Sequence, residues 1–246
     1  FDFDENEFQN YKNNSKKKLI IGTACGRSGL RWISEIHSAH KNCIALIEPF
    51  PLHESFYRYA TFNNLNIDHS SFFNTLKYQF IKLWKKYDSI IFSSPWVCFG
   101  LDEIEKNFQP NKYIFMFRDP KKVVNSLVLK GWYNEKIFKY ESNKITGLQP
   151  NLKNFHHNFS RISPKNDYFT EWNNLTSVGK CSWFWSEANQ SIYLFLKKVS
   201  KDKKLIFKLE DIDQNYNWYA KYIKYFDLEK QFSLKKFLEL KQIMPN

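Results

Sequence analysis

The 246-residue sequence is poor in glycine, proline and cysteine, and each shortage excludes a class of protein. With 7 glycines and 8 prolines, the chain is neither collagen-like nor linker-like. The four cysteines form no C-x-x-C pair, so we expect neither a zinc site nor a thioredoxin-like site. Their low density argues against a disulfide scaffold and leaves room for an isolated bridge at most.

Long apolar runs are also lacking. No run approaches the roughly 18 residues that span a membrane, so no integral membrane segment is expected in this chain. No signal peptide is visible, and the expected location is cytoplasmic. A targeting segment removed before Phe1 would leave no trace in the sequence.

Aromatic and basic residues are abundant. Aromatic residues make up 19% of the chain and hydrophobic residues 43%, which is enough for a sizeable core in a single domain over residues 1–246. Lys and Arg number 37 against 25 Asp and Glu, a net charge of +12 that implies anionic partners. The basic residues form scattered small clusters, so nucleic acid is not an expected partner.

From Lys18 onward, short apolar runs alternate with amphipathic stretches. This alternation predicts an α/β fold with a parallel sheet flanked by helices, whose ligands bind at the carboxyl ends of the strands. Residues 1–17 are expected to be an irregular lead-in, and the polar, aromatic segment 131–180 a variable segment that binds a substrate. The expected strands are 17–23, 43–48, 89–94, 112–117 and 205–210; the expected helices are 31–40, 70–87 (capped by Ser70 or Ser71), 119–130, 181–199 and 218–226.

The first strand leads through the turn GTACGRSGLRW into a helix. Backbone N–H groups at such a helix start bind phosphate or sulfate, and Arg27 adds a permanently charged donor. The turn nearly spells a nucleotide-binding P-loop, but it is one residue short and has Arg in place of Lys. Cys25 and Arg31 have the C-x5-R spacing of a cysteine phosphatase, although no His precedes Cys25. A plain glycine turn with a surface Arg is a further interpretation.

The fourth strand ends in a second turn, FRDPKKVVNSLV. Arg118 ends the strand, Pro120 suits the first turn of a helix, and Ser126 follows about two helical turns later. An Arg and a Ser placed in this way can hold one phosphate. Arg118 and Asp119 could instead form a surface ion pair.

Both turns resemble motifs of the sulfotransferases that use 3′-phosphoadenosine 5′-phosphosulfate (PAPS). GRSGLRW resembles their phosphosulfate-binding loop, with Leu30 and Arg31 where the family usually has two threonines. RDPxxVxxS resembles their 3′-phosphate motif, SSPWVCFG their strand-end proline segment and FKLEDI their late strand with a Glu–Asp pair. The basic-glycine motif of the cytosolic branch is absent near the C-terminus, so the bacterial and carbohydrate branches are the better match.

The resemblance implies a P-loop-like sulfotransferase fold and a nucleotide donor, PAPS, whose product is adenosine 3′,5′-bisphosphate. It implies a small-molecule or carbohydrate acceptor, such as a glycan, that is sulfated on a hydroxyl or an amine. No metal is expected, because PAPS carries an already activated sulfuryl group. The donor-binding residues it implies are Gly26, Arg27, Ser28, Gly29, Leu30, Arg31, Trp32, Arg118 and Ser126.

Sulfuryl transfer needs a cation beside the leaving phosphate and a base for the acceptor proton. Arg27 is the expected cation. Glu48 is the expected base, since the resembling branches carry a glutamate near this point, and His53 is the second candidate. His37 and His40 are expected to pack or to lie on the surface rather than to bind a metal, and His156 and His157 could contact the acceptor.

Two other functions stay open at this point. One is a cysteine-dependent phosphatase that uses Cys25 and Arg31. The other is a non-catalytic basic module that binds anionic polymers. Six aromatic residues of the variable segment could stack on an acceptor or form local core: Trp132, Tyr133, Phe155, Tyr168, Phe169 and Trp172.

Overall fold

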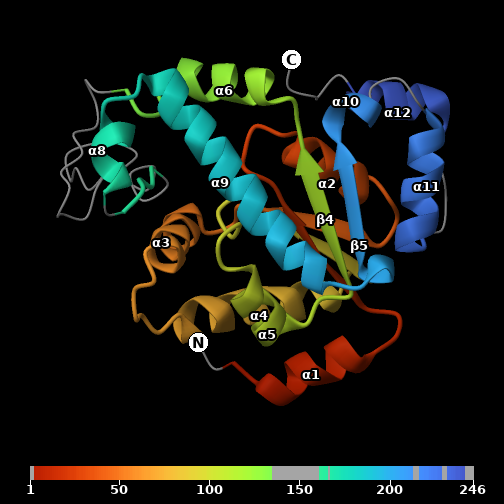
Figure 1. Cartoon of the computed structure of the whole chain (residues 1–246). Coiled ribbons are helices and arrows are strands. Elements are labelled where there is room, and N and C mark those ends of the chain that lie inside the picture. Colours follow the sequence, from red (N-terminus) through yellow and green to blue (C-terminus); the bar gives the residue numbers. More distant parts are fainter. Residues whose placement is uncertain (1–2, 135–160, 166, 213–215, 229–231, 242–246) are drawn as a thin grey trace.

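Five parallel strands form the centre of the molecule in the order β2-β3-β1-β4-β5 (Figure 1). The computed structural model describes residues 3–134, 161–165, 167–212, 216–228 and 232–241. The predicted parallel sheet and all five predicted strands are confirmed, within one or two residues at their ends. The strands are β1 (Lys18–Thr23), β2 (Cys43–Ile47), β3 (Ser89–Ser93), β4 (Lys112–Phe117) and β5 (Lys204–Lys208).

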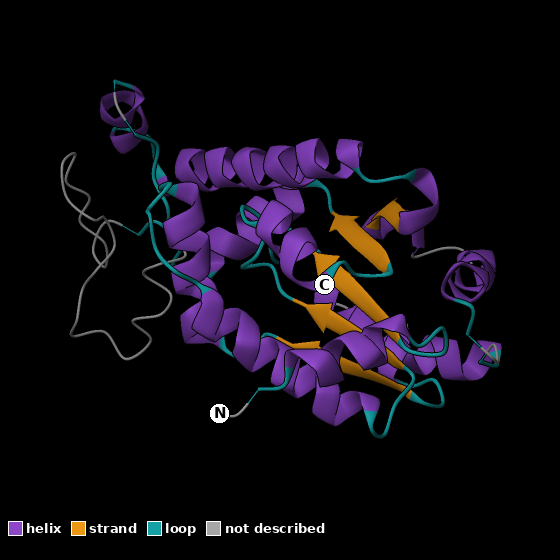
Figure 2. Ribbon diagram, turned by 90° about the horizontal axis from the view of Figure 1, so that it is seen from below, coloured by secondary structure: helices purple, strands orange, loops and turns teal. Residues whose placement is uncertain are grey.

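Helices cover both faces of this sheet, as predicted (Figures 1 and 2). The larger core cluster joins one face to α1 (Glu5–Asn13), α4 (Ser70–Trp84), α5 (Leu101–Phe108), α6 (Pro120–Leu129) and α9 (Ser177–Lys198). The second cluster joins the other face to α2 (Leu30–Ser38), α11 (Tyr216–Phe226) and α12 (Leu234–Lys241). The remaining described helices are α3 (Pro51–Phe62), α8 (Tyr168–Asn173), α10 (Leu209–Ile212) and the 3₁₀ turn Lys201–Lys203.

Alternation along β1 explains why it is the centre of the sheet. Leu19 and Ile21 point into the larger core cluster and Ile20 into the second, so both faces of the strand are buried. β1 also pairs with a strand on either side, through Ile20↔Ile91 of β3 and Gly22↔Ile114 of β4. A strand this apolar is stable only where helices cover both of its faces.

The expectation of an irregular lead-in over residues 1–17 is wrong, because α1 forms there. The Asp4 carboxylate accepts the Asn6 N–H at 2.8 Å and caps the helix. Phe8 is fully buried, with its ring centroid 5.7 Å from that of Trp84, and Glu5 pairs with Lys77 at 2.8 Å. Aromatic contacts and ion pairs of this kind dock a segment whose polar composition concealed a helix.

Two other expectations need correction. α4 has the predicted apolar face, but neither Ser70 nor Ser71 caps it: the Asp68 carboxylate accepts the Ser70 N–H at 2.8 Å, and His69 precedes the helix. The segment 131–180 is not irregular throughout, since α8 and the first residues of α9 lie in it. Phe169 and Trp172 are buried on α8 and explain its docking.

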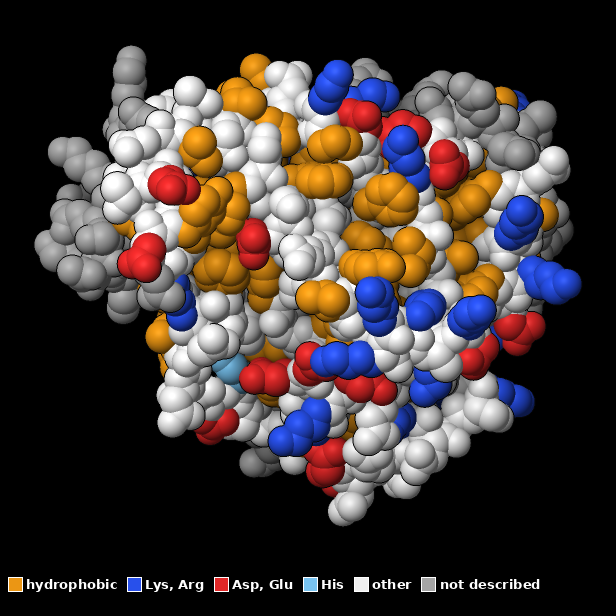
Figure 3. All heavy atoms as spheres, in the orientation of Figure 1, with side chains coloured by type: hydrophobic (Ala, Val, Ile, Leu, Met, Phe, Trp, Pro, Cys, Tyr) orange, Lys and Arg blue, Asp and Glu red, His pale blue; other side chains and the backbone are white. Residues whose placement is uncertain are grey.

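In the described ranges, no helix is both long enough and apolar enough to cross a membrane. Basic and acidic side chains are interspersed on the face drawn in Figure 3, in keeping with the scattered basic clusters of the sequence. His37 and His40 pack in the core, as predicted. The two imidazoles hydrogen-bond to hydroxyls of α11, His37 to Tyr222 at 3.0 Å and His40 to Tyr219 at 2.9 Å.

Phe8→Ala is expected to lower the free energy of unfolding by about 3 to 5 kcal/mol, because it opens a cavity between α1 and α4. Leu129→Ala is the matched control, since the Leu129 side chain is 78% exposed and its truncation should change stability by less than about 0.5 kcal/mol. Urea unfolding followed by circular dichroism measures both. Equal stability of the two variants would show that α1 does not depend on this contact.

Candidate functional site

A cavity of about 820 Å³ lies at the carboxyl ends of the strands, where ligands of parallel sheets bind. Its walls come from the turn after β1, the end of β2, the loop after β3, and parts of α3 and α6. The wall is strongly basic: Glu48 is its one acidic member among the described residues, whereas five members are cationic, namely Arg27, Arg31, Arg58, Lys130 and Arg161. The charge favours an anionic occupant.

The turn after β1 has the backbone of an anion-binding loop. Gly26 and Gly29 have φ values of 97° and 88°, and Arg27 between them has a φ of 56°. A Cβ on Gly29 would lie 2.8 Å from the Leu209 side chain, so only glycine fits there. Gly29 precedes α2 without a side-chain cap, and the first turn of α2 contains no acidic residue. The N–H groups at this helix start are thus available to an anion at the cavity wall.

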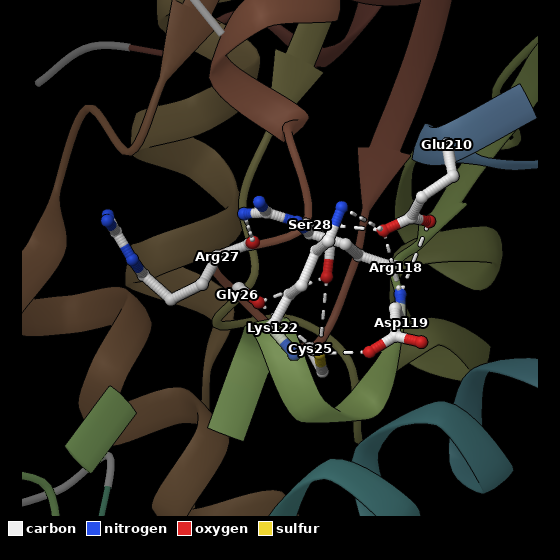
Figure 4. A network of polar contacts seen from close by, with 8 residues as sticks. All are labelled: Cys25, Gly26, Arg27, Ser28, Arg118, Asp119, Lys122 and Glu210. Atoms are coloured by element: carbon white, nitrogen blue, oxygen red, sulfur yellow. Dashed lines mark hydrogen bonds and ion pairs between the residues drawn. The ribbon is translucent and has the colours of Figure 1, made fainter. Parts of the chain in front are cut away.

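The structure brings the two predicted anion turns together. Arg27 Nε donates a hydrogen bond to Ser126 Oγ at 2.8 Å, across 99 residues of chain. Arg118 Nη1 donates to the backbone oxygen of Arg27 at 3.3 Å (Figure 4). One turn therefore contacts the other through both a side chain and the backbone.

Glu210 holds Arg118 from the side opposite Arg27. It is the second residue of α10, the short helix that follows β5. The Arg118 side chain is only 5% exposed, and its Nε lies 3.8 Å from Glu210 Oε1. Glu210 also accepts the Asp119 N–H, at 3.2 Å from Oε1 (Figure 4). Arg118 Nε has no hydrogen bond to any described residue, so this buried guanidinium keeps a donor for a further acceptor.

The other predicted donor residues divide into two groups. Gly26, Arg27, Gly29, Leu30 and Arg31 lie in the cavity wall. Ser28 and Trp32 do not belong to the described wall; both are fully buried.

Ser28 and Trp32 support the turn from behind. The Ser28 hydroxyl donates to the Gly26 backbone oxygen at 3.1 Å, which braces the turn from within. The Trp32 ring packs against Trp218 of α11, with 5.9 Å between ring centroids, and anchors α2 on the second core cluster.

Glu48 lies in the cavity wall, and His53 does not belong to the described part of it. Glu48 Oε2 accepts a hydrogen bond from Trp96 Nε1 at 2.9 Å, which fixes the direction of the carboxylate. Its backbone adopts a φ of 45°, and its N–H donates to the Ser93 oxygen at 3.0 Å. His53 is exposed on α3, next to the Phe50 ring. The geometry favours Glu48 over His53 as the candidate base.

Two charged residues of α3, Glu54 and Arg58, escaped sequence reasoning. Glu54 is fully buried and accepts hydrogen bonds from Ser94 Oγ and from the Phe50 N–H. Burial raises the pKa of its carboxyl from 4.5 to about 7. Arg58 is 1% exposed and donates to the Pro95 backbone oxygen. Their spacing of four residues on one helix was the available signal, but it also fits an exposed ion pair.

The geometry argues against Cys25 as a phosphatase nucleophile. Cys25 is 1% exposed, and burial raises the pKa of its thiol to about 11, so the thiol stays protonated near neutral pH. Arg31, its expected partner, has a side chain that is 78% exposed and pairs with Glu35 at 3.7 Å. All four cysteines are free thiols and buried.

The described aromatic residues of segment 131–180 form mainly local core. Tyr133, Phe169 and Trp172 are buried, whereas Tyr168 is 46% exposed. Trp132 is in the cavity wall, and the Arg161 guanidinium lies 3.7 Å from its ring centroid. Phe155, His156 and His157 lie outside the described residues.

No protein-family model matches the sequence, and no curated protein matches it either. Solved structures do match. The "Sulfotransferase Domain from the Synechococcus PCC 7002 Olefin Synthase" aligns with a TM-score of 0.55 at 14% identity, over 89% of this chain and 77% of that chain. The "Sulfotransferase Domain from the Curacin Biosynthetic Pathway" aligns with a TM-score of 0.52 at 14% identity, over 87% of this chain and 75% of that chain. The chain thus has a sulfotransferase-like fold, which confirms the predicted fold class.

Glu54→Gln is expected to flatten the pH dependence of stability. Because the folded-state pKa is raised, the native protein holds this proton up to about pH 7, and the free energy of unfolding falls as pH rises from 4.5 to about 7. The variant should lose this fall, of about 3 kcal/mol, since glutamine does not titrate. Urea unfolding between pH 4.5 and 8 measures it, with the exposed Glu171→Gln as control. Identical pH slopes for wild type and Glu54→Gln would contradict the assignment.

Proposed function

We propose that this protein is a sulfotransferase that moves a sulfuryl group from PAPS to a hydroxyl or amine of a small-molecule or carbohydrate acceptor. The observation that carries the proposal is the junction of the two anion turns, where Arg27 Nε donates to Ser126 Oγ and Arg118 Nη1 to the Arg27 oxygen. A nucleotide with phosphates at two positions needs two anion sites close together. The sulfotransferase-like fold supports the same proposal.

The residues present fit such a donor. The start of α2 and Gly26 to Leu30 would hold the 5′-phosphosulfate end through backbone N–H groups. Arg118, through its guanidinium charge, and Ser126 would hold the 3′-phosphate. Leu30 is buried and Arg31 is exposed. Neither offers the hydroxyl contacts of the family's two threonines, and the charge of Arg31 would replace those contacts.

PAPS supplies an activated sulfuryl group, so the chain has two tasks. Glu48 would take the acceptor proton while the acceptor oxygen or nitrogen bonds to sulfur. Arg27 would stabilise the negative charge that appears on the leaving phosphate as the sulfur–oxygen bond breaks. The products are the sulfated acceptor and adenosine 3′,5′-bisphosphate. The segment 131–180 would contribute to acceptor binding. We propose that the protein is related to the bacterial and carbohydrate branches of the sulfotransferases.

Arg118→Ala is expected to weaken binding of adenosine 3′,5′-bisphosphate about tenfold to a hundredfold, because charged hydrogen bonds to the 3′-phosphate are lost. Isothermal titration calorimetry measures the affinity. The matched control is Lys121→Ala, which removes the same charge from an exposed position of α6 and should stay within about twofold of wild type. Equal affinities of the two variants, or no binding to folded wild type, would contradict the proposed donor site.

Glu48→Gln is expected to lower kcat by about a hundredfold or more and to leave nucleotide affinity unchanged, since the amide fills the same space but accepts no proton. Turnover is followed as release of adenosine 3′,5′-bisphosphate, and affinity by calorimetry. His53→Ala is the second arm, because it removes the alternative base from its exposed position. If His53→Ala abolishes turnover and Glu48→Gln does not, the assignment of the base is wrong.

A further inference from the structure

Arg58 is a buried cation in the cavity wall that forms no ion pair with a carboxylate of the described residues. Its side chain is 1% exposed, and no described carboxylate oxygen lies within 4.0 Å of it. Nη2 donates to the Pro95 backbone oxygen, and Nε has no hydrogen bond to any described residue. An unpaired guanidinium in such a place is costly unless a bound anion supplies the missing charge.

The polar groups around Arg58 come from α3, the end of β2 and the loop after β3. The two carboxylates among them make their described hydrogen bonds to other groups, and Glu54 interacts with Arg58 only through its charge. Glu54, one turn earlier on α3, accepts from Ser94 and from the Phe50 N–H. Glu48, at the end of β2, accepts from Trp96 Nε1. The Cys98 thiol in the loop after β3 hydrogen-bonds with Arg58, and burial raises its pKa, so it brings no negative charge to the guanidinium.

Aromatic rings hold the guanidinium in place. The Arg58 Cζ lies 4.8 Å from the ring centroid of Trp96 and 5.2 Å from that of Phe184 on α9. These cation–π contacts fix its orientation and offset part of the cost of burial, but they leave its Nε–H without an acceptor. The two rings therefore fix the position of a guanidinium whose Nε–H donates no hydrogen bond to a described residue.

Trp96 connects this cation to the candidate base. Its Nε1 donates to Glu48 at 2.9 Å, and Arg58 lies over its ring, so one indole orients both groups. The preceding residue, Pro95, lies beside the first anion turn, since a Cβ on Gly26 would be 3.9 Å from the Pro95 Cβ. The proposed 3′-phosphate site uses Arg118 and Ser126, neither of which contacts Arg58 through any described hydrogen bond. Arg58 thus adjoins the position where an acceptor hydroxyl would meet Glu48.

We propose that Arg58 binds a carboxylate of the acceptor, so that the substrate is a hydroxyl compound that also carries an acidic group. The inference rests on the proposed function and specifies its substrate class. A guanidinium edge matches the two oxygens of a carboxylate, and Arg161 over Trp132 adds positive charge to the same cavity. The carboxylate can belong to a uronic acid in a glycan or to a small aromatic hydroxy acid, and both sources are tested below.

The test uses two matched pairs of probes with the protein saturated by adenosine 3′,5′-bisphosphate. One pair is a heparosan tetrasaccharide and its carboxyl-reduced form; the other is 4-hydroxyphenylacetate and 4-hydroxyphenylacetamide. Calorimetry is expected to give at least about tenfold tighter binding of the acid than of the neutral form in one pair, because the neutral form lacks one charged hydrogen bond to Arg58. Whichever pair shows the preference identifies the source of the carboxylate. Equal binding of acid and neutral forms in both pairs, or no binding of either acid, would overturn the proposal.

Arg58→Met removes the charge but keeps a long side chain to pack between Trp96 and Phe184. It should abolish the preference for the acid, whereas Arg58→Lys, which keeps the charge, should retain part of it. If Arg58 has a purely structural role, Arg58→Met lowers the melting temperature and weakens binding of the acid and neutral probes alike. If Arg58 holds the sulfuryl group, Arg58→Met raises the KM for PAPS and leaves the acid preference intact. Either result would overturn the proposal.

The nucleotide titration separates this inference from the proposed function. If wild type fails to bind adenosine 3′,5′-bisphosphate, the donor proposal fails, and the acid preference is then measured with the protein alone. If the nucleotide binds and the acid preference is absent, the donor proposal stands and the role of Arg58 is rejected.

Discussion

The pairing of β1 with β4 is the constraint on which the site depends. Parallel register, with Thr23 opposite Phe115, makes the two strands end at the same edge of the sheet. Arg27 and Arg118, 91 residues apart in sequence, consequently meet there, and the contact between the turns follows from the strand order. Ser126 joins them because α6 begins directly after β4. A fold with β1 and β4 apart would leave two separate turns, neither with the donors for two phosphates.

Several residues behind the two turns hold this junction in place. The arrangement restricts the backbone of the first turn and brings like charges together in the cavity. Gly29 accepts a conformation and a close contact that side chains exclude, and Ser28 and Trp32 brace the turn from behind. Glu210, on α10 directly after β5, fixes Arg118 from the strand neighbouring β4 on its other side. The cavity gathers several cations against a single carboxylate, Glu48, which a bare protein would avoid because like charges repel. The anionic substrates proposed for this cavity would offset that repulsion when bound.

The sequence predicts the sheet and both turns because the relevant signals are local. Apolar runs of five or six residues mark buried strands, and Arg118, Pro120 and Ser126 mark the second turn within one short stretch. Other features depend on contacts between distant segments. α1 is stable because Phe8 packs on Trp84, and Arg58 matters because Pro95, Trp96 and Phe184 surround it. The contacts of Phe8 and of Arg58 both come from segments distant in sequence, so the sequence near either residue does not predict them. The sequence placed Glu48 before His53 as the candidate base, and the cavity wall, which includes Glu48 and not His53 among its described residues, favours the same order.

The most direct test of the account is a crystal structure of the protein with adenosine 3′,5′-bisphosphate. The account predicts the 3′-phosphate against Arg118 and Ser126, and the 5′-phosphate at the N–H groups of Gly26 to Leu30 before α2. The sulfuryl position would then face Glu48 and Trp96 across the cavity. A nucleotide bound elsewhere, for example in the smaller pocket between α6 and α9, or bound with its two phosphates exchanged, would contradict the assignment of the two turns.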